Sequence, residues 1–390
     1  MRIVFVIPYF YPALQYGGQP KSCYELARAL VRRGHSVTVV TTDSAGSARL
    51  SPEPAAGIRR TVEDIEVFYY RNFSNYLAFR HRVFLPIALF LNIRHHLSDC
   101  DVLHIHELRS TLTVAAHRAA RSLGLPFVLS PHGGLKWLGK ENAKRMFDSM
   151  WGRAILGDAA RLVAISPLEV KDAQTFGVGQ ERIRILPNLI FPEDYSALPQ
   201  TGDFRRRWNI REEKVVLFLG RLHWIKGADL LIRALAGSSS NVRLVIAGPD
   251  DGQESQLRRM LAGTDLEKRT TFTGYLDHKA KLESLVDADV VAIPSRSEVF
   301  AITAVEALMC GTPVLLSSSC GLFPAPGTNC GVFRFENENV DDLADKLRVV
   351  LGEDCGAASA AGRDFVLREF GPDAIAERAE VIYEEAIRRG

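Results

Sequence analysis

The chain of 390 residues lacks several sequence patterns that define common classes of protein. No stretch of about 18 uninterrupted apolar residues is present, so the sequence predicts no membrane-spanning helix. No G-x-G-x-x-G run follows a predicted strand, which removes the main support for a dinucleotide-dependent dehydrogenase. The Gly-Lys-Ser/Thr ending of a P-loop and the H-x-x-x-H and G-x-S-x-G patterns of hydrolases are absent as well.

Cysteine is scarce and scattered, and no C-x-x-C pair occurs. The spacing of the six cysteines fits neither a zinc site nor a disulfide framework, so we expect reduced thiols in a cytoplasmic protein and no bound metal. These residues are Cys23, Cys100, Cys310, Cys320, Cys330 and Cys355. The N-terminal segment MRIVFVIPYF has no small-residue cleavage site, so it is interpreted as a first strand rather than a secretory signal.

The two halves of the chain differ in charge, although the net charge is only +2. Residues 1–190 contain 24 basic and 15 acidic side chains, whereas the remainder contains 24 and 31. A basic first half predicts contact with something anionic, such as a phosphorylated lipid, a membrane surface or an acidic glycan, although a solvated face would have the same composition. The basic residues are not interleaved with clustered aromatic residues, so no nucleic-acid partner is expected.

The length of the chain predicts two domains, because one hydrophobic core rarely serves so many residues. Short β-branched runs alternate with helical patterns, which indicates an α/β fold with doubly wound parallel sheets. The predicted strands are 3–7, 37–41, 65–70, 102–106, 127–130 and 162–165 in the first half, and 215–219, 243–247, 271–273, 290–293 and 313–317 in the second.

A segment without periodicity, from Pro187 to Asp203, separates the two halves. We therefore predict a first domain over residues 1–190 and a second over residues 191–370. The tail 371–390 has a proline near its start and ends at a glycine, which predicts a closing helix packed back on the first domain. Doubly wound sheets bind ligands at the carboxyl ends of their strands, so the site is expected there.

The segment from Pro294 to Pro313 combines a strand end, a polar loop and a helix that is expected to begin near Phe300. The start of such a helix offers unpaired N–H groups to an anion. Glu298 precedes the helix and Glu306 follows eight residues later, which in helical geometry is a rise of about 12 Å and a net turn of about 80°. The two carboxylates are interpreted as bracketing an elongated ligand; the alternative is a loop acid and a solvated helix residue.

The sequence around these glutamates resembles a known signature. A Glu, seven residues and a second Glu, followed by Ala-Leu and by Gly311-Thr312-Pro313, resembles the large family of retaining glycosyltransferases with two facing Rossmann-like domains, the GT-B fold (glycosyltransferase family 4-like, group 1). A second block agrees with this resemblance. Arg221 closes a predicted strand and Lys226 follows at the spacing that the family uses to neutralise the diphosphate of the donor.

The resemblance extends to the first half of the chain and implies a set of roles. Gly17 and Gly18 are similar to the family's glycine-rich loop at the donor phosphate, and His132 is similar to a histidine that reaches the donor sugar. His104 and His106 resemble a D-V-x-H-x-H run and are expected to line the core or a cleft rather than to be catalytic. The implied catalytic residues are Glu298, His132, Arg221 and Lys226, and the implied donor-binding residues are Gly17, Gly18, Arg221, Lys226, Gly274, Tyr275, Phe300, Ala301, Ile302 and Glu306.

Two positions depart from the family pattern. Ala301 stands where the family usually has a glycine, which obscures the preference for one sugar. The segment CGLFPAP, from Cys320 to Pro326, lacks the glutamate of the family's Gly-Gly-x-x-Glu run, so the contact of that glutamate with the donor is in doubt.

The function implied by the resemblance is retaining transfer of a hexose-type sugar from a UDP- or GDP-linked donor to a glycan or lipid-linked acceptor, in cell-surface polysaccharide synthesis and without a metal or other cofactor. A nucleotide-sugar epimerase of the same fold and a catalytically inactive nucleotide-sugar-binding protein are the alternatives. The segment from Tyr76 to Leu97 predicts a basic amphipathic helix on an anionic membrane surface, or else a buried helix with a charged edge that Pro86 interrupts.

Overall fold

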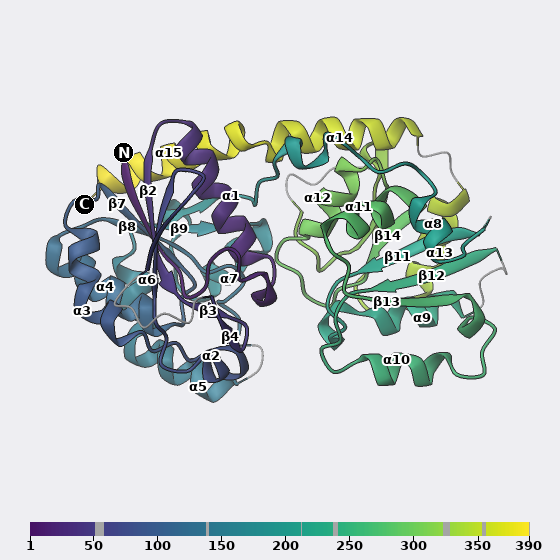
Figure 1. The fold of residues 1–390 in the computed structure, drawn as a ribbon, viewed down its shortest axis with the longest axis horizontal. Helices are drawn as coiled ribbons and strands as arrows, with labels where there is room; N and C mark the ends of the chain where they lie inside the picture. Colours follow the sequence, from purple (N-terminus) through teal and green to yellow (C-terminus); the bar gives the residue numbers. More distant parts are fainter. Residues whose placement is uncertain are drawn as a thin grey trace. The chain divides into compact units, whose positions relative to one another are not determined.

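The computed structural model describes residues 1–50, 58–137, 140–211, 213–236, 241–322, 328–352 and 356–389. The chain divides into two compact units, and each is an α/β domain (Figure 1). Unit 1 consists of Met1–Leu189 with Pro372–Gly390, and unit 2 consists of Ile190–Gly371. The predicted fold class, parallel sheets in Rossmann-like domains, is confirmed.

The sheet of unit 1 has the strand order β10-β9-β8-β7-β1-β2-β6-β5. All neighbours pair in parallel except β5 and β6, and both faces of the central strands are buried, as their continuous apolar runs require. The strands are β1 Arg2–Val6, β2 Ser36–Thr42, β5 Ile58–Val62, β6 Ile65–Tyr70, β7 Val102–His106, β8 Phe127–Ser130, β9 Arg161–Ala164 and β10 Ile183–Ile185, and β3 Ser44–Ala45 pairs separately with β4 Ala48–Arg49.

The helices of unit 1 follow the strands in alternation. They are α1 Gln19–Arg32, α2 Asn75–His81, α3 Ile87–Leu97, α4 Thr111–Leu123, α5 Glu141–Phe147, α6 Arg153–Asp158, α7 Pro167–Thr175 and α15 Pro372–Ile387, with the short helical turns η1 Leu14–Tyr16 and η2 Asp148–Gly152. Helix α1 buries Leu26 and Leu30 on one face and is followed by Gly34 with a φ of 86°, so the predicted stop at this glycine is confirmed.

The interruption at Pro86 that the sequence predicts between Tyr76 and Leu97 is confirmed, and two helices occupy this segment. Helix α2 ends at Arg82, which has a left-handed φ of 59°, and α3 begins only after Pro86 because a proline has no N–H with which to continue a helix. One face of α3 is buried, while Leu91 on the other face is 82% exposed. Within the described residues, every helix is too short or too polar to cross a membrane.

The last helix, α15, belongs to unit 1 although it follows unit 2 in the chain. Tyr383 is fully buried, and its hydroxyl lies 2.8 Å from Nδ1 of His104 on β7. Glu380 accepts hydrogen bonds from Arg33, at 2.6 Å for Nε, and this partner lowers the pKa of Glu380 to about 2. A buried hydrogen bond and an ion pair therefore join the last helix to the first sheet.

The sheet of unit 2 is entirely parallel, with the strand order β13-β12-β11-β14-β15-β16. Its strands are β11 Lys214–Leu219, β12 Val242–Ala247, β13 Thr270–Gly274, β14 Val290–Ile293, β15 Val314–Ser317 and β16 Val332–Phe335. Helices α9 Ala228–Leu235, α10 Glu254–Leu261 and α13 Val340–Gly352 pack together, and α8 Asp203–Arg207, α11 His278–Asp287, α12 Ile302–Met309 and α14 Gly356–Phe370 form a second group (Figure 1).

Candidate active site

In unit 2, strand order reverses between β11 and β14. The chain continues from β11 to β12 and β13 on one side, and from β14 to β15 and β16 on the other. Loops that follow such neighbouring parallel strands diverge, and the space at their carboxyl ends is the usual ligand site of these sheets. Arg221 and Lys226 follow β11, and Glu298 follows β14, so three predicted catalytic residues lie at this switch point.

The charged side chains at the switch point pair with one another. Lys226 forms an ion pair with Glu298, and the Ser295 hydroxyl donates a hydrogen bond of 3.4 Å to the same Glu298 oxygen. Arg221, with a half-exposed side chain, forms an ion pair with Asp251, which follows β12. Each of the two predicted phosphate-binding cations thus has a carboxylate partner that a phosphate oxygen can replace.

Two glycines allow the loops to approach each other closely. A Cβ at Gly227 would collide with the carbonyl oxygen of Pro294, and a Cβ at Gly248 would collide with that of Gly220. Both glycines have positive φ values, 72° and 141°, that side chains disfavour. The glycine after Lys226 is therefore required by the contact between the β11 and β14 loops.

Arg296 anchors the loop after β14, a role that was not predicted from the sequence. Its guanidinium donates to Asp229 at 2.8 and 2.7 Å and to the Trp224 carbonyl at 2.6 Å. Its own N–H donates to the Ile225 carbonyl at 2.8 Å. The turn that carries Lys226, η5 Trp224–Lys226, is thereby tied to the loop that carries Glu298.

The backbone of Glu298 is extended and pairs with the segment that follows β15. Its N–H donates to the Ser319 carbonyl at 3.1 Å, and its carbonyl accepts from Gly321 at 2.8 Å. Helix α12 begins at Ile302 with Ala301 as its N-cap, so the expected helix start near Phe300 is confirmed. The expected helical geometry between the two glutamates is wrong, because residues 298–301 precede the helix. Backbone bonds to the segment after β15 compete with the helix over residues 298–301.

Glu306 is buried, so the alternative of a solvated helix residue is also wrong. It is 5% exposed, and its Oε1 lies 2.6 Å from Nζ of Lys281 on α11. A buried carboxylate needs such a partner because desolvation of an unpaired charge is costly. The pair ties α11 to α12 below the switch point.

The other predicted donor-binding residues of unit 2 lie near the same strand ends. Gly274 ends β13 with a φ of 68°, and Tyr275 beside it is 72% exposed. Phe300 and Ala301 are buried, and the Phe300 ring packs edge-on against Phe370 at 5.7 Å. Phe300 and Ala301 thus leave little side-chain surface for a ligand. The departure from the family pattern at 323–326 lies outside the described residues.

Unit 1 has its own switch point, between β1 and β7. Gly17, with a φ of 104°, follows the turn η1 after β1, and Gly18 is the N-cap of α1. His132 follows β8 at the same edge of the sheet and has a left-handed φ of 51°. A non-glycine residue in this conformation is strained and must be held by its surroundings.

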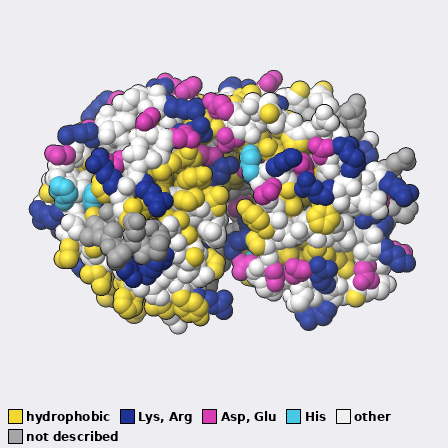
Figure 2. All heavy atoms as spheres, viewed as in Figure 1, with side chains coloured by type: hydrophobic (Ala, Val, Ile, Leu, Met, Phe, Trp, Pro, Cys, Tyr) yellow, Lys and Arg dark blue, Asp and Glu magenta, His cyan; other side chains and the backbone are white. Residues whose placement is uncertain are grey.

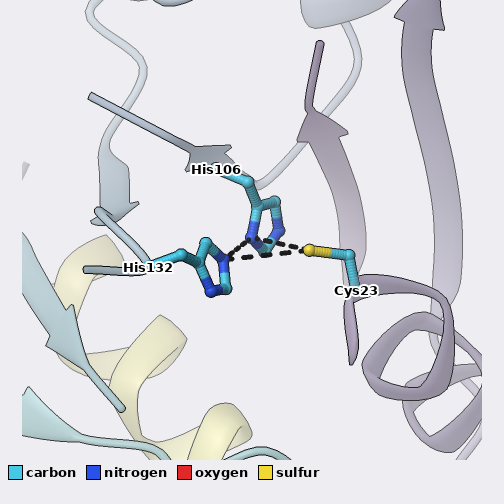
Figure 3. A group of neighbouring side chains, drawn as sticks. All are labelled: Cys23, His106 and His132. Carbon is cyan, nitrogen blue, oxygen red and sulfur yellow. Dashed lines mark hydrogen bonds between the residues drawn. The ribbon is translucent and has the colours of Figure 1, made fainter. Parts of the chain in front are cut away.

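His132 belongs to a compact group of side chains (Figure 3). Its Nε2 lies 2.9 Å from Nδ1 of His106 and 3.8 Å from Sγ of Cys23. Burial lowers the pKa of His132 to about 4 and holds that of His106 well below its usual value, because a charged imidazole would lose its hydration. Both rings are therefore neutral at physiological pH.

Glu169, at the first turn of α7, supports the strained turn and was not predicted. Its side chain is fully buried and accepts hydrogen bonds from the backbone N–H of Gly133 at 2.5 Å and of Ile165 at 2.9 Å. Burial raises its pKa to about 7. Because Gly133 directly follows His132, this carboxyl group positions the histidine through the backbone.

Comparison with known proteins identifies the family of the chain. Residues 16–194 match the family model Glycosyltransferase Family 4, and residues 200–361 match the model Glycosyl transferases group 1. The two matches together extend over most of the chain. The chain therefore belongs to the family 4-like, group 1 glycosyltransferases and is a glycosyltransferase.

Individual relatives span nearly the whole chain. It is 28% identical over 393 residues to D-inositol 3-phosphate glycosyltransferase of Xylanimonas cellulosilytica, covering 96% of this chain and 93% of that protein. It is 25% identical over 350 residues to a subunit of Saccharomyces cerevisiae phosphatidylinositol N-acetylglucosaminyltransferase, covering 88% and 73%. The crystal structure of Anabaena HepE in complex with UDP has a TM-score of 0.78 at 18% identity, covering 98% and 100%.

The low pKa of His132 can be tested by titration. We expect its imidazole to titrate near pH 4, well below the value of about 6.5 of an ordinary histidine. Nitrogen-15 NMR of the histidine side chains would show this, with His132→Gln as the assignment control. A midpoint near 6.5 would contradict the buried neutral ring.

The same shift predicts a pH dependence of stability. Since the folded pKa of His132 lies below its unfolded value, its contribution to stability is complete above about pH 6.5 and is lost as the pH falls towards 4. The free energy of unfolding of the wild type should therefore decline relative to His132→Gln over that interval, measured by urea denaturation. A constant difference between the two proteins would argue against the shift.

Proposed function

We propose that the protein transfers a hexose-type sugar from a UDP- or GDP-linked donor to a glycan or lipid-linked acceptor, with retention of anomeric configuration and without a metal. The observation that carries the proposal is the placement of Arg221 and Lys226 beside Glu298 at the β11/β14 switch point. Support for the donor class comes from Anabaena HepE, which has been crystallised with UDP and with UDP-glucose.

The two cations would bind the donor diphosphate. Arginine presents a planar fork to phosphate oxygens, and lysine adds a point charge. When the diphosphate binds, its oxygens replace Asp251 as the partner of Arg221 and Glu298 as the partner of Lys226. Each cation thus exchanges one anionic partner for another. The exchange releases the Glu298 carboxylate, which then faces the donor sugar.

Transfer would proceed on one face of the sugar. The bond between the anomeric carbon and the leaving phosphate oxygen breaks, and the acceptor hydroxyl forms the new bond to that carbon from the same side. The hydroxyl proton passes to an oxygen of the leaving diphosphate. Arg221 and Lys226 stabilise the negative charge that develops on this group, and Glu298 stabilises positive charge on the sugar. The contact of His132 with the donor sugar stays a prediction of the family resemblance.

The acceptor side of the proposal concerns unit 1. Large apolar side chains are exposed on and before α2 and α3, with Phe73, Tyr76 and Ile87 each more than 60% exposed. Figure 2 shows hydrophobic side chains gathered along the lower edge of unit 1 in this view. Exposed arginines, such as Arg80 and Arg94, lie on the same two helices. This combination suits a surface of anionic lipid, on which a lipid-linked acceptor would be presented.

Substitution of Arg221 tests the donor site. Arg221→Ala should remove most transfer and donor hydrolysis, because the fork that holds the diphosphate is lost, and Arg221→Lys should retain part of the activity. In a thermal-shift screen with UDP, GDP, ADP and their sugars, a donor at 100 times its dissociation constant should add about 2.7 kcal/mol of stability, with or without magnesium. Arg259→Ala, at an exposed arginine on α10, is the matched control.

Near wild-type turnover in Arg221→Ala would contradict the assignment of the donor site. A shift without transfer or donor hydrolysis would favour the catalytically inactive nucleotide-sugar-binding protein, and no shift with any nucleotide would contradict the donor site. Formation of an isomerised nucleotide sugar without acceptor would favour the epimerase alternative.

Glu306 is proposed to hold the donor ribose, in addition to its ion pair with Lys281. Glu306→Gln should raise the donor KM by about tenfold, equivalent to about 1.4 kcal/mol, with a smaller effect on kcat. Lys281→Gln removes the same ion pair but keeps the carboxylate, so it should lower stability with little effect on donor KM. Equal KM changes in both variants would mean that Glu306 acts only through the packing of α11 on α12.

Binding to lipid vesicles tests the acceptor side. We expect the protein to co-sediment with anionic vesicles at low salt and to lose most of this binding in Ile87→Asp/Leu91→Asp, because both side chains project from α3 into solvent. Val381→Asp/Ile387→Asp places the same two charges at exposed positions of α15 and is the control. Equal binding of all three proteins, or no binding of the wild type, would remove membrane contact from the proposal.

A further inference from the structure

Three side chains of unit 1 that are distant in sequence direct their metal-binding atoms towards one point. Cys23 comes from α1, His106 from the end of β7 and His132 from the turn after β8, and Figure 3 shows them facing one another. The distances are 2.9 Å between the two ring nitrogens, 3.3 Å from Sγ to His106 Nδ1 and 3.8 Å from Sγ to His132 Nε2. This group is called the Cys-His-His cluster below.

These distances match the requirements of one tetrahedral cation. With zinc bonds of about 2.0–2.1 Å to nitrogen and about 2.3 Å to sulfur, the ligand atoms of a tetrahedral site lie about 3.3 Å apart for two nitrogens and about 3.6 Å apart for nitrogen and sulfur. All three observed separations lie within about half an ångström of these values. One ion could therefore contact all three atoms after small side-chain movements.

The donor set selects the kind of cation. Two imidazoles and a thiolate suit zinc and similar borderline metals, whereas magnesium and calcium prefer oxygen. The Cys23 thiol must lose its proton on binding, so affinity should increase with pH.

The surroundings hold the cluster in place. The His104 ring stacks on His106 at 3.9 Å, and both of its nitrogens are engaged, by Tyr383 and Ser130. His104 is thus a support for the cluster and not a further ligand. A small cavity of about 20 Å³ is lined by the three cluster residues, among others, and is large enough for one water as a fourth ligand.

We propose that Cys23, His106 and His132 form a zinc-binding site, and that zinc bound there inhibits the enzyme by occupying Nε2 of His132. Zinc binding stands on the geometry of the Cys-His-His cluster alone, whereas inhibition rests on the proposed function. The cation is an inhibitor and plays no part in transfer itself.

Cobalt reports on such a site by its colour. The metal-free wild type, titrated with Co²⁺, should bind one equivalent and develop a thiolate-to-cobalt charge-transfer band, which Zn²⁺ then abolishes. Cys23→Ala should lose this band and bind Zn²⁺ about 10- to 100-fold more weakly or worse. Cys320→Ala, which removes a buried thiol of unit 2, is the matched control and should retain the band.

The variants also need to be folded, which far-UV circular dichroism would establish, and Cys23→Ser provides a second replacement of similar size. A wild type without the charge-transfer band, or a band that persists in a folded Cys23 variant, would overturn the site.

Inhibition is measured separately, as donor turnover with and without Zn²⁺, each variant relative to its own metal-free rate. Zn²⁺ should lower the wild-type rate by about tenfold or more at saturation and should leave the relative rate of Cys23→Ala nearly unchanged. Binding without inhibition in the wild type would overturn the inhibitory role. If no donor is turned over at all, the proposed function fails, while the cobalt titration still decides the metal site.

Discussion

At Gly227 the chain after β11 passes so close to the carbonyl of Pro294 that no side chain fits between them. This contact sets the separation of the two loops that carry the charged residues of unit 2. Lys226, one residue earlier, can therefore reach Glu298, four residues beyond Pro294. Arg296, on the loop after β14, links the same two loops by hydrogen bonds to the Trp224 carbonyl and to Asp229. A rigid backbone junction is what an anion site requires, because its charges must be in place before the ligand arrives.

In unit 1 the residue at the switch point is also held in a fixed position, but by hydrogen bonds rather than by ion pairs. Its switch-point histidine, His132, is held by the neutral side chains of His106 and Cys23 and, through the backbone of Gly133, by the buried carboxyl group of Glu169. Low local polarity keeps the imidazoles uncharged and able to accept hydrogen bonds or a metal. An uncharged His132 imidazole would suit contact with a neutral sugar hydroxyl. The same uncharged ring would suit the zinc site proposed above.

Much of the fold could be predicted because its central strands are continuous β-branched runs, and every predicted strand is present. Strands β3, β4, β5, β10 and β16 were missed. Strands β3 and β4 have two residues each, β5 contains two arginines on an edge, and an arginine interrupts the apolar run of β10 and of β16. The strands before Arg221, Lys226 and Glu298 were recognisable in the sequence, but the roles predicted for these residues came from the resemblance to the family. The extended backbone at Glu298 could not be predicted because it depends on bonds to residues 319–321. Cys23 and Glu169 act through partners far along the chain, which periodicity does not reveal.

The position of α15 has a consequence for synthesis on the ribosome. Unit 2 is one continuous stretch, Ile190–Gly371, and all the strands of its sheet are available before the chain is complete. Unit 1 begins the chain but needs Pro372–Gly390 to finish, since His104 on β7 receives its Tyr383 partner only from this last helix. While unit 2 is being translated, Nδ1 of His104 therefore lacks its Tyr383 partner and the part of the sheet that α15 covers at β7 and β8 stays open, so the nascent first unit exposes apolar surface during this interval.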